Sequence, residues 1–417
     1  MSVKIKPSPL NGAVKAPPSK SVTHRYLVIS ALAEGESMLR DPLVCVDTLA
    51  TVNGLRRLGV LIDECECGWR VKGGGLYAPD DVIDCNESGT TLRLLTGASS
   101  LLQEAVTLSG APSLLRRPNK PLLDALNQLG AQTSSVDGYP PVTVMGRIHG
   151  GRAEIRGDVS SQFISAILLA APYAVEGVEL TVTGGLESCP YVELTMDTMT
   201  RAGVKPIHSD NMDRINVPLG EYSPINRRVD GDWSSAAYML AMGVIADKIH
   251  VDNLDLYSKQ ADKKILYILN EMGAYTKIKG NRVTVEKSRL KGVEVDLSDS
   301  PDLFPVVACL CSVAEGTSML TGLRRLKYKE SDRLKATVEG LKKMGVAVKG
   351  DASTLSIKGG IPHGAVINPH NDHRIAMSFA VLAQATRGET TIMNPECVTK
   401  SYPGFWRELE KIGGRIN

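Results

Sequence analysis

Apolar residues along this chain follow a pattern that repeats about every seventy positions. In each repeat, a leucine-rich stretch of helical periodicity ends in a glycine, and a small or β-branched residue follows that glycine. Successive glycines of this kind are separated by 71, 73, 70, 72 and 68 residues. The six are Gly59, Gly130, Gly203, Gly273, Gly345 and Gly413. A period of this length indicates six copies of one supersecondary unit.

A second pattern, an apolar helix-like run that closes on a small loop, recurs between those glycines. In unit one the patterns predict helices at 19–33 and 47–58, a strand at 37–40, and a hairpin from 61–66 and 70–72. In unit five they predict helices at 302–314 and 331–344, a strand at 318–321, and a hairpin from 347–349 and 354–358. Each unit therefore reads strand, helix, strand, helix and a strand pair.

The first helix of each unit is apolar on nearly every side, whereas the hairpin strands alternate between apolar and polar positions. A helix that is apolar all round is buried, and an alternating strand has one face on a core and one face in water. We therefore predict an α/β protein with helices inside and sheets outside. The predicted fold is a two-domain inside-out α/β barrel of six βαβαββ units, three per domain.

The boundary between the two predicted domains lies in the stretch 220–230, which contains Pro224 and the pair Arg227 and Arg228. We place one domain at 15–226 and the other at 1–14 plus 227–417, with the active site in the cleft between them. The first dozen residues predict a lone strand ahead of unit one.

Composition narrows the class of protein. Apolar residues make up 43% of the 417, which is enough for a large core, and the net charge is only +2. Near-neutral charge gives no global field for nucleic acid or membranes. The eight cysteines form no CxxC motif and no Cys/His cluster, so they predict reduced thiols and no metal site. We expect a cytoplasmic monomer that binds neither nucleic acid nor membranes.

The buried helices begin with residues that a purely structural helix would avoid. Basic side chains in a first turn oppose the helix dipole, at a cost of about 0.3–1 kcal/mol each. Several of these turns also carry Ser, Thr or Gly, whose hydroxyl and N–H groups hold phosphate or carboxylate. The turns lie at 20–25, 88–93, 160–162, 302 and 371–374. They predict bound anions; the alternative is that each arginine pairs with an acid elsewhere.

A second set of basic or polar residues precedes the later helices, at 116–118, 188–191, 328–333 and 400–403. Each stretch alone is explained as a helix cap, often with Pro near the first turn. Together the two sets predict a positively charged cleft that takes small polyanions and closes around them.

At these residues the chain resembles the 5-enolpyruvylshikimate-3-phosphate synthases. The resemblance rests on separate motifs spread over the whole length: Lys20-Ser21 with Arg25, Ser88-Gly89-Thr90-Thr91 with Arg93, Ser160-Ser161-Gln162-Phe163, Lys329-Glu330-Ser331-Asp332-Arg333, and Asn371-Asp372-His373-Arg374. It implies an enolpyruvyl transferase that joins phosphoenolpyruvate to the 5-hydroxyl of shikimate 3-phosphate and releases phosphate. It also implies that neither a metal nor an organic cofactor takes part, and that glyphosate competes with phosphoenolpyruvate.

The resemblance also implies which residues bind the two substrates. Shikimate 3-phosphate would contact Lys20, Ser21, Arg25, Ser160, Ser161, Gln162, Ser188, Asp302 and Lys329. Phosphoenolpyruvate would contact Lys20, Gly89, Arg117, Gln162, Arg333, Arg374 and Lys400. Arg93 and Tyr191 would support these contacts.

Addition of a hydroxyl to an enol ether needs a base for the hydroxyl proton and an acid for the methylene carbon. Asp302 is the candidate base, and Glu330 or Lys20 is the candidate acid, with the choice between them open. Each carboxylate also has a plainer explanation, Asp302 as the first-turn acid of a helix and Glu330 as a helix-surface acid. His24 and His373 are expected to be structural.

Two positions depart from the family pattern. Glu87 precedes the Ser-Gly-Thr loop where many members have Asn or a small residue, and Arg325 stands where bacterial members often have an Asn. Two other readings remain. A sister transferase that acts on UDP-N-acetylglucosamine would carry a reactive cysteine in the loop 111–118, which has none. A non-catalytic clamp would need a continuous basic surface.

Overall fold

The computed structural model describes residues 1–417 and contains two compact units. The N-terminal unit comprises Pro18–Val229, and the C-terminal unit comprises Met1–Pro17 with Asp230–Asn417. The observed boundaries follow Pro17 and Val229, three residues later than the predicted boundaries after residues 14 and 226.

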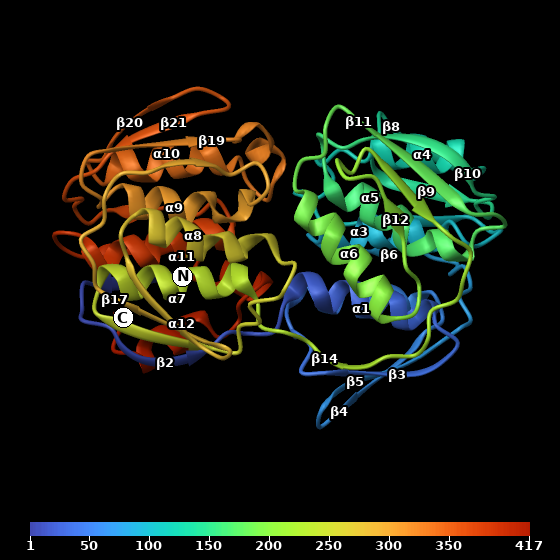
Figure 1. Cartoon of the computed structure of the whole chain (residues 1–417), viewed down its shortest axis with the longest axis horizontal. Helices are drawn as coiled ribbons and strands as arrows, with labels where there is room; N and C mark the ends of the chain where they lie inside the picture. Colours follow the sequence, from blue (N-terminus) through green and yellow to red (C-terminus); the bar gives the residue numbers. More distant parts are fainter. The chain divides into compact units, whose positions relative to one another are not determined.

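Three helices fill the interior of the N-terminal unit (Figure 1). They are α1 (Lys20–Leu32), α3 (Gly89–Ser99) and α5 (Ser161–Ala170). Eleven of the thirteen residues of α1 are buried. The outer helices are α2 (Val46–Arg57), α4 (Lys120–Gln128) and α6 (Cys189–Arg201), and a short turn η1 (Ala171–Tyr173) follows α5. The prediction of helices inside is confirmed for this unit.

Three four-stranded sheets enclose these helices, in the orders β14-β3-β5-β4, β6-β7-β9-β8 and β10-β11-β13-β12. The first pair in each order is parallel and the other pairs are antiparallel. The strands are β3 (Gly35–Arg40), β4 (Leu61–Cys65), β5 (Gly68–Gly73), β6 (Ile83–Asp84), β7 (Val106–Ser109), β8 (Gln132–Val136), β9 (Tyr139–Met145), β10 (Gly151–Arg156), β11 (Val178–Thr183), β12 (Ile207–His208), β13 (Arg214–Val217) and β14 (Asn226–Arg228).

The C-terminal unit repeats this plan. Its inner helices are α7 (Trp233–Ile245), α9 (Phe304–Cys311) and α11 (His373–Leu382), and its outer helices are α8 (Ile265–Glu271), α10 (Arg333–Lys343) and α12 (Phe405–Lys411). Short turns are η2 (Ala261–Lys264), η3 (Pro301–Leu303), η4 (Arg324–Tyr328), η5 (Ala383–Ala385) and η6 (Pro395–Lys400). The helix predicted to start at 302 therefore begins as η3, before the α-helical bonds start at Phe304.

The sheets of the C-terminal unit have the orders β2-β15-β17-β16, β18-β19-β21-β20 and β22-β23-β1-β24. Their strands are β1 (Ser2–Lys6), β2 (Asn11–Lys15), β15 (Lys248–Asp252), β16 (Tyr275–Lys279), β17 (Arg282–Glu286), β18 (Glu294–Asp296), β19 (Thr317–Thr321), β20 (Ala347–Gly350), β21 (Leu355–Lys358), β22 (Val366–Ile367), β23 (Thr390–Met393) and β24 (Arg415–Ile416). No helix of the chain has both the length and the hydropathy that a membrane crossing requires.

The prediction of a lone N-terminal strand is wrong. The first fifteen residues form two strands in two different sheets: β1 pairs with β23 and β24, and β2 pairs with β15. Similarly, β14 pairs with β3, almost two hundred residues earlier. Each of these strands completes a sheet whose other strands come from a distant part of the chain. A pattern read over a short window contains no signal for such pairing.

Close approach of two inner helices depends on Gly97 in α3. A Cβ atom at this position would lie 2.4 Å from the carbonyl oxygen of Ala166 in α5. The obstacle is backbone within a buried helix, which cannot turn aside as a flexible side chain can.

We therefore expect Gly97→Ala to lower the free energy of unfolding by about 1–3 kcal/mol, as overpacking does in other cores. Gly75→Ala is the control, because a Cβ atom there would meet nothing within 4 Å. Urea unfolding followed by circular dichroism measures both. Equal stability of the two variants would contradict the packing described for α3 and α5.

Candidate active site

Lys20 opens α1 and is oriented by an acid that the sequence analysis did not identify. Ser19 caps the helix by accepting a bond from the N–H of Val22, and the Nζ of Lys20 lies 2.8 Å from Asp47 Oδ2 in the first turn of α2. The Lys20 side chain is 14% exposed and that of Asp47 is 4% exposed. A short bond between two largely buried groups fixes the position of the ammonium group.

Arg25 is a buried cation whose partners are all neutral. Its guanidinium donates to the hydroxyls of Thr195 at 2.8 Å and Ser165 at 3.3 Å, and to the backbone carbonyls of Ser21 at 2.9 Å and Tyr191 at 3.0 Å. Burial lowers the pKa of Arg25 to about 10, so it remains charged at neutral pH. A buried charge without an opposite charge is costly. Arg25 is therefore a candidate binding group for an anion.

Arg93 and Gln162 form a second polar group in the N-terminal unit. Arg93 donates to Gln162 Oε1 at 2.5 Å and to Asn119 Oδ1 at 3.2 Å, and it lies over the ring of Phe163. Gln162 in turn donates to Thr90 Oγ1 at 3.0 Å. These bonds join the starts of α3 and α5.

Gly89 leaves room for two guanidinium groups at the start of α3. A Cβ atom at Gly89 would lie 3.1 Å from Nη1 of Arg117 and 3.5 Å from Nη1 of Arg93. Ser88 caps this helix through a bond from the N–H of Thr91. The positive end of a buried helix and two cations thus meet at one place, which suits a negatively charged ligand.

Of the four serines named by the resemblance, Ser21 lies in the first turn of α1 and the other three lie at the starts of α5 and α6. Ser160 caps α5 by accepting from the N–H of Gln162 at 3.3 Å, and Ser161 is buried. Ser188 precedes α6, is buried, and has a φ of 58°. This left-handed conformation is unusual for a residue other than glycine. Tyr191 connects this turn to Arg25 through its carbonyl oxygen.

In the C-terminal unit, Asp302 is surrounded by cations. Its Oδ1 accepts from Nη1 of Arg333 at 2.6 Å and from Nζ of Lys329 at 3.2 Å, and its Oδ2 lies 2.8 Å from Nη2 of Arg374. Although burial opposes ionisation, Arg374, Lys329 and Arg333 hold the pKa of Asp302 well below its usual value. Asp302 is therefore a carboxylate in this arrangement, and a weak base.

Arg333 connects Asp302 to two further carboxylates. Its Nε donates to Asp372 Oδ2 at 2.8 Å, and its Nη2 donates to Glu330 Oε2 at 2.6 Å. Burial opposes its charge, but Asp372, Glu330 and Asp302 together raise the pKa of Arg333 above its ordinary value. Asp372 also caps α11 by accepting from the N–H of Arg374. Glu330 is thus part of this ionic cluster and is not a free helix-surface acid.

The remaining predicted residues fall as follows. Lys400 ends η6 and is buried, and Arg374 donates to the hydroxyl of Tyr238 at 3.4 Å.

His24 is fully buried against Thr51, and burial lowers its pKa to about 3, so it is neutral and structural. No group of three or more His, Cys, Asp and Glu side chains is placed to hold a metal ion.

The two departures from the family pattern have local partners. Glu87 accepts a bond from the hydroxyl of Ser113 at 2.9 Å, which ties it to the loop 111–118. Arg325 is buried in η4 and donates to the carbonyl oxygen of Ser298 at 2.6 Å. Arg325 therefore holds the segment that leads into Asp302.

Asp262 is a buried carboxyl group that the sequence analysis missed. It accepts a short hydrogen bond from the hydroxyl of Ser234, and its other oxygen has no hydrogen-bond partner. Its turn, η2, is joined to η3 by a bond from the hydroxyl of Ser300 to the carbonyl of Ala261. Burial, and after it the charge of Asp302, raises the pKa of Asp262 to about 7. No sequence signal marks this residue, because only its surroundings make it unusual.

Each unit thus holds a cluster of largely buried cations at or next to helix starts, and comparison of the fold with solved structures gives the class of protein. The fold is that of the enolpyruvyl transferases: the enolpyruvyl transferase NikO from Streptomyces tendae matches the chain with a TM-score of 0.80 at 18% identity, covering 100% of this chain and 98% of that one. EPSP synthase from Acinetobacter baumannii matches with a TM-score of 0.83 at 28% identity, covering 100% of both chains.

The family model for EPSP synthase (3-phosphoshikimate 1-carboxyvinyltransferase) matches residues 4–409. Curated proteins named 3-phosphoshikimate 1-carboxyvinyltransferase are also similar. The one from Methanoculleus marisnigri is 43% identical over 96% of each chain, and the one from Methanocaldococcus jannaschii is 41% identical over 98% of this chain and 97% of its own. This chain therefore belongs to the EPSP synthase family, as the motifs of the sequence indicate.

The raised pKa of Asp262 leads to a prediction about stability. A carboxyl group whose pKa is higher in the folded protein disfavours folding increasingly as pH rises from its unfolded value near 4 to about 7. Asparagine has no such charge. We expect Asp262→Asn to gain stability relative to the parent protein between pH 5 and pH 8 in urea unfolding.

Asp252→Asn is the matched control for this measurement. The bond from Arg282 lowers the pKa of Asp252, so its contribution is fully present at both pH values and is lost only in acid. Its stability difference from the parent should be the same at pH 5 and pH 8. A pH-independent difference for Asp262→Asn as well would contradict the environment described for Asp262.

Proposed function

We propose that this protein transfers the enolpyruvyl group of phosphoenolpyruvate to the 5-hydroxyl of shikimate 3-phosphate and releases phosphate. The proposal rests on the cluster in which Asp302 is held by Arg333, Lys329 and Arg374, within a chain of the EPSP synthase family. We further propose that this cluster and the cations of the N-terminal unit act in the same reaction, and that the protein works as a cytoplasmic monomer.

Shikimate 3-phosphate would be bound largely by the N-terminal unit. Arg25 supports this assignment most strongly, because it is buried and its described partners are neutral. A phosphate group would supply the missing negative charge, and hydroxyl groups around it would complete the contacts. The assigned residues are Lys20, Ser21, Arg25, Ser160, Ser161, Gln162 and Ser188, together with Asp302 and Lys329 from the C-terminal unit.

Phosphoenolpyruvate carries a carboxylate and a phosphate and would need several cations. We assign to it Lys20, Gly89, Arg117, Gln162, Arg333, Arg374 and Lys400, with Arg93 and Tyr191 in support. Arg333 and Arg374 now bind the protein's own carboxylates. These carboxylates hold the two guanidinium groups in place. An incoming substrate anion can therefore bind guanidinium groups that are already oriented.

Sharing of Arg333 and Arg374 with substrate anions explains how Asp302 can act as a base. Three cations lower the pKa of Asp302 in the free protein. When Arg333 and Arg374 also bind substrate anions, their effect on Asp302 weakens, and its affinity for a proton increases. Asp302 then takes the proton of the 5-hydroxyl while that oxygen bonds to the central carbon of phosphoenolpyruvate.

The methylene carbon receives a proton in the same step and becomes a methyl group. Glu330 and Lys20 are the candidate donors: the Lys20 ammonium already carries a proton, whereas Glu330, a carboxylate paired with Arg333, must first take one up from solvent. Loss of a proton from the methyl group and of phosphate from the central carbon restores the enol ether. The cations stabilise the negative charge of the departing phosphate. Acid, base and counter-charges all come from side chains, so the proposal includes neither a metal nor an organic cofactor.

Asp302→Asn should reduce phosphate release about 10²–10⁴-fold, because it removes the proton acceptor. Release would be measured with phosphoenolpyruvate and, separately, shikimate 3-phosphate, shikimate or UDP-N-acetylglucosamine. Asp252→Asn, a surface position in the same unit, should retain the parent rate. The proposal fails if folded parent protein releases no phosphate with shikimate 3-phosphate, or if Asp302→Asn remains fully active.

Gly89→Ala tests the assignment of phosphoenolpyruvate to the start of α3. The added methyl group would lie 3.1 Å from Arg117, so the guanidinium must move by a few tenths of an ångström. We expect the KM for phosphoenolpyruvate to rise about 3- to 30-fold, since small displacements of a binding group cost that much. Glyphosate should compete with phosphoenolpyruvate in the parent and bind more weakly to the variant.

Steady-state kinetics with phosphoenolpyruvate as the varied substrate measures both effects, with Gly75→Ala as the control. Non-competitive inhibition by glyphosate, or an unchanged KM for phosphoenolpyruvate in Gly89→Ala, would contradict the assignment of Gly89 and Arg117 to the phosphoenolpyruvate site.

A further inference from the structure

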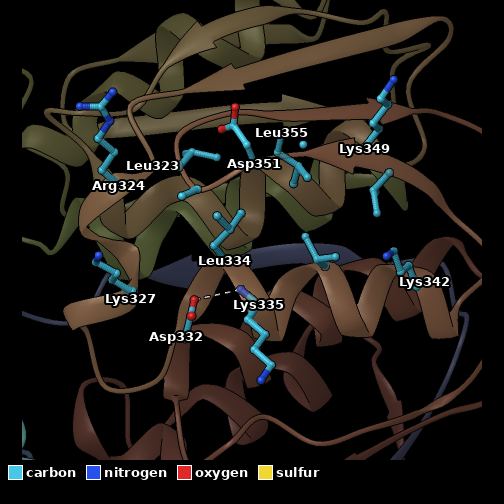
Figure 2. Close-up of a pocket in the computed structure, with 14 residues that line it drawn as sticks. Leu323, Arg324, Lys327, Asp332, Leu334, Lys335, Lys342, Lys349, Asp351 and Leu355 are labelled. Carbon is cyan, nitrogen blue, oxygen red and sulfur yellow. Dashed lines mark hydrogen bonds between the residues drawn. The ribbon is translucent and has the colours of Figure 1, made fainter.

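A groove of about 490 Å³ lies between α10 and the β20–β21 hairpin in the C-terminal unit (Figure 2). We call it the α10 groove. Its floor is apolar and includes Leu323, Leu334 and Leu355, which are labelled in Figure 2. Val338 and Val348 complete the floor. A volume of this size is within the range of small-molecule sites.

Five cationic side chains surround this apolar floor: Arg324, Lys327, Lys335, Lys342 and Lys349. All five are exposed, and none forms an ion pair with a carboxylate. In Figure 2, Arg324 and Lys327 lie at one end of the groove and Lys342 and Lys349 at the other. By contrast, Lys343, which belongs to α10 but does not line the groove, pairs with Glu339 at 2.9 Å.

The two acids of the α10 groove already hold backbone turns. Asp351 accepts from the N–H groups of Ser353 at 2.7 Å and Thr354 at 2.9 Å, and Asp332 caps α10 through the N–H of Lys335. Their side chains are therefore directed at backbone donors and not at the surrounding cations. The groove keeps an excess of positive charge over an apolar surface.

The repeated fold provides an internal comparison. Between α4 and the β8–β9 hairpin, at the equivalent place in the N-terminal unit, lies a groove of about 600 Å³. Its one cation, Lys120, pairs with Asp124 at 3.0 Å, and Asp137 adds a second acid. The fold therefore produces a groove beside an outer helix, but the positive charge and the apolar floor belong to the α10 copy. Architecture alone does not explain them.

We propose that the α10 groove binds an elongated aromatic dianion, a ring system with a carboxylate or phosphate group at each end. The apolar floor suits the ring, and the cations at both ends suit the two anionic groups. Lys335 and Lys342 are seven residues apart on α10, which corresponds to about 10 Å along the helix. A ligand with an ammonium group would be repelled by the same five cations.

The occupant would also act on the segment 323–335. Leu323, Arg324 and Lys327 line the groove at the start of this segment, and Asp332, Leu334 and Lys335 line it at the end. Lys329, Glu330 and Arg333, which bind the Asp302 cluster or belong to it, lie between them. A ligand that contacts both ends should restrain the loop that carries these residues. This effect on segment 323–335 rests on the proposed function, whereas binding of the dianion to the α10 groove does not.

The test uses naphthalene-2,6-dicarboxylate, a rigid fluorescent dianion, titrated into the full-length protein without substrates. Lys342→Gln/Lys349→Gln should weaken its binding about fivefold or more, since each exposed charge contact contributes a modest amount. The control is Lys343→Gln/Lys358→Gln, which removes two charges from the same helix and hairpin outside the groove. The control should bind as the parent does, and 2-naphthoate, with one charge, should bind more weakly than the dianion.

Equal binding to the parent and the groove variant would overturn the proposal, because the dianion would then occupy other cations such as those of the active site. Equal affinity for 2-naphthoate would also overturn it, since the two-ended charge would be irrelevant. In kinetics, the dianion should change the KM for phosphoenolpyruvate about twofold or more in the parent and the control, but not in the groove variant. Binding without a kinetic change would refute the effect on segment 323–335.

Discussion

The structure depends on the burial of helices that are apolar all round. Such a helix has no face for water, so each unit encloses its three inner helices between sheets. The first N–H groups of any helix lack intrahelical partners, and burial removes the water that would otherwise bind them, so these ends must be capped or must bind ligands. Ser19, Ser88, Ser160, Asp232 and Asp372 cap inner helices. Several of the candidate site residues lie at or next to these ends.

Charge at the helix starts is maintained in two different ways. In the C-terminal unit, Asp302, Glu330 and Asp372 neutralise Arg333, so the cluster is stable before any ligand arrives. In the N-terminal unit, Arg25 has only neutral partners and bears the cost of an uncompensated buried charge. A site of this second kind binds an anion with less competition, at the expense of stability in the free protein.

Much of the fold could be predicted from the sequence because the pattern that marks each helix or strand extends only over that element. Residues 19–33 and 47–58 show helical periodicity in any window, and α1 and α2 lie within one or two residues of those limits. The strands β1, β2 and β14 could not be placed, since their partners are distant and their own patterns do not distinguish one sheet from another. Topology of this kind is a property of the whole chain.

The candidate site was predicted through its motifs and not through its partners. Lys20, Arg25, Arg333 and Arg374 stand in recognisable stretches. By contrast, Asp47, Asp262 and the bonds that Arg333 donates to Asp372 become apparent only when distant helices are brought together. The sequence alone does not show how deeply an aspartate is buried or which charged groups surround it. Its pKa, which decides whether it serves as a base, a counter-ion or a neutral group, is set by the fold.

Calorimetric binding of shikimate 3-phosphate and of shikimate to the parent and to Arg25→Gln would test the central claim most directly. We expect the parent to bind the phosphate ester at least about tenfold more tightly than shikimate, since a charge-assisted contact to a buried guanidinium is strong. We expect Arg25→Gln to lose this preference while its free energy of unfolding without ligand stays the same or rises. Retention of the preference in folded Arg25→Gln would contradict the view that the buried guanidinium forms the anion site.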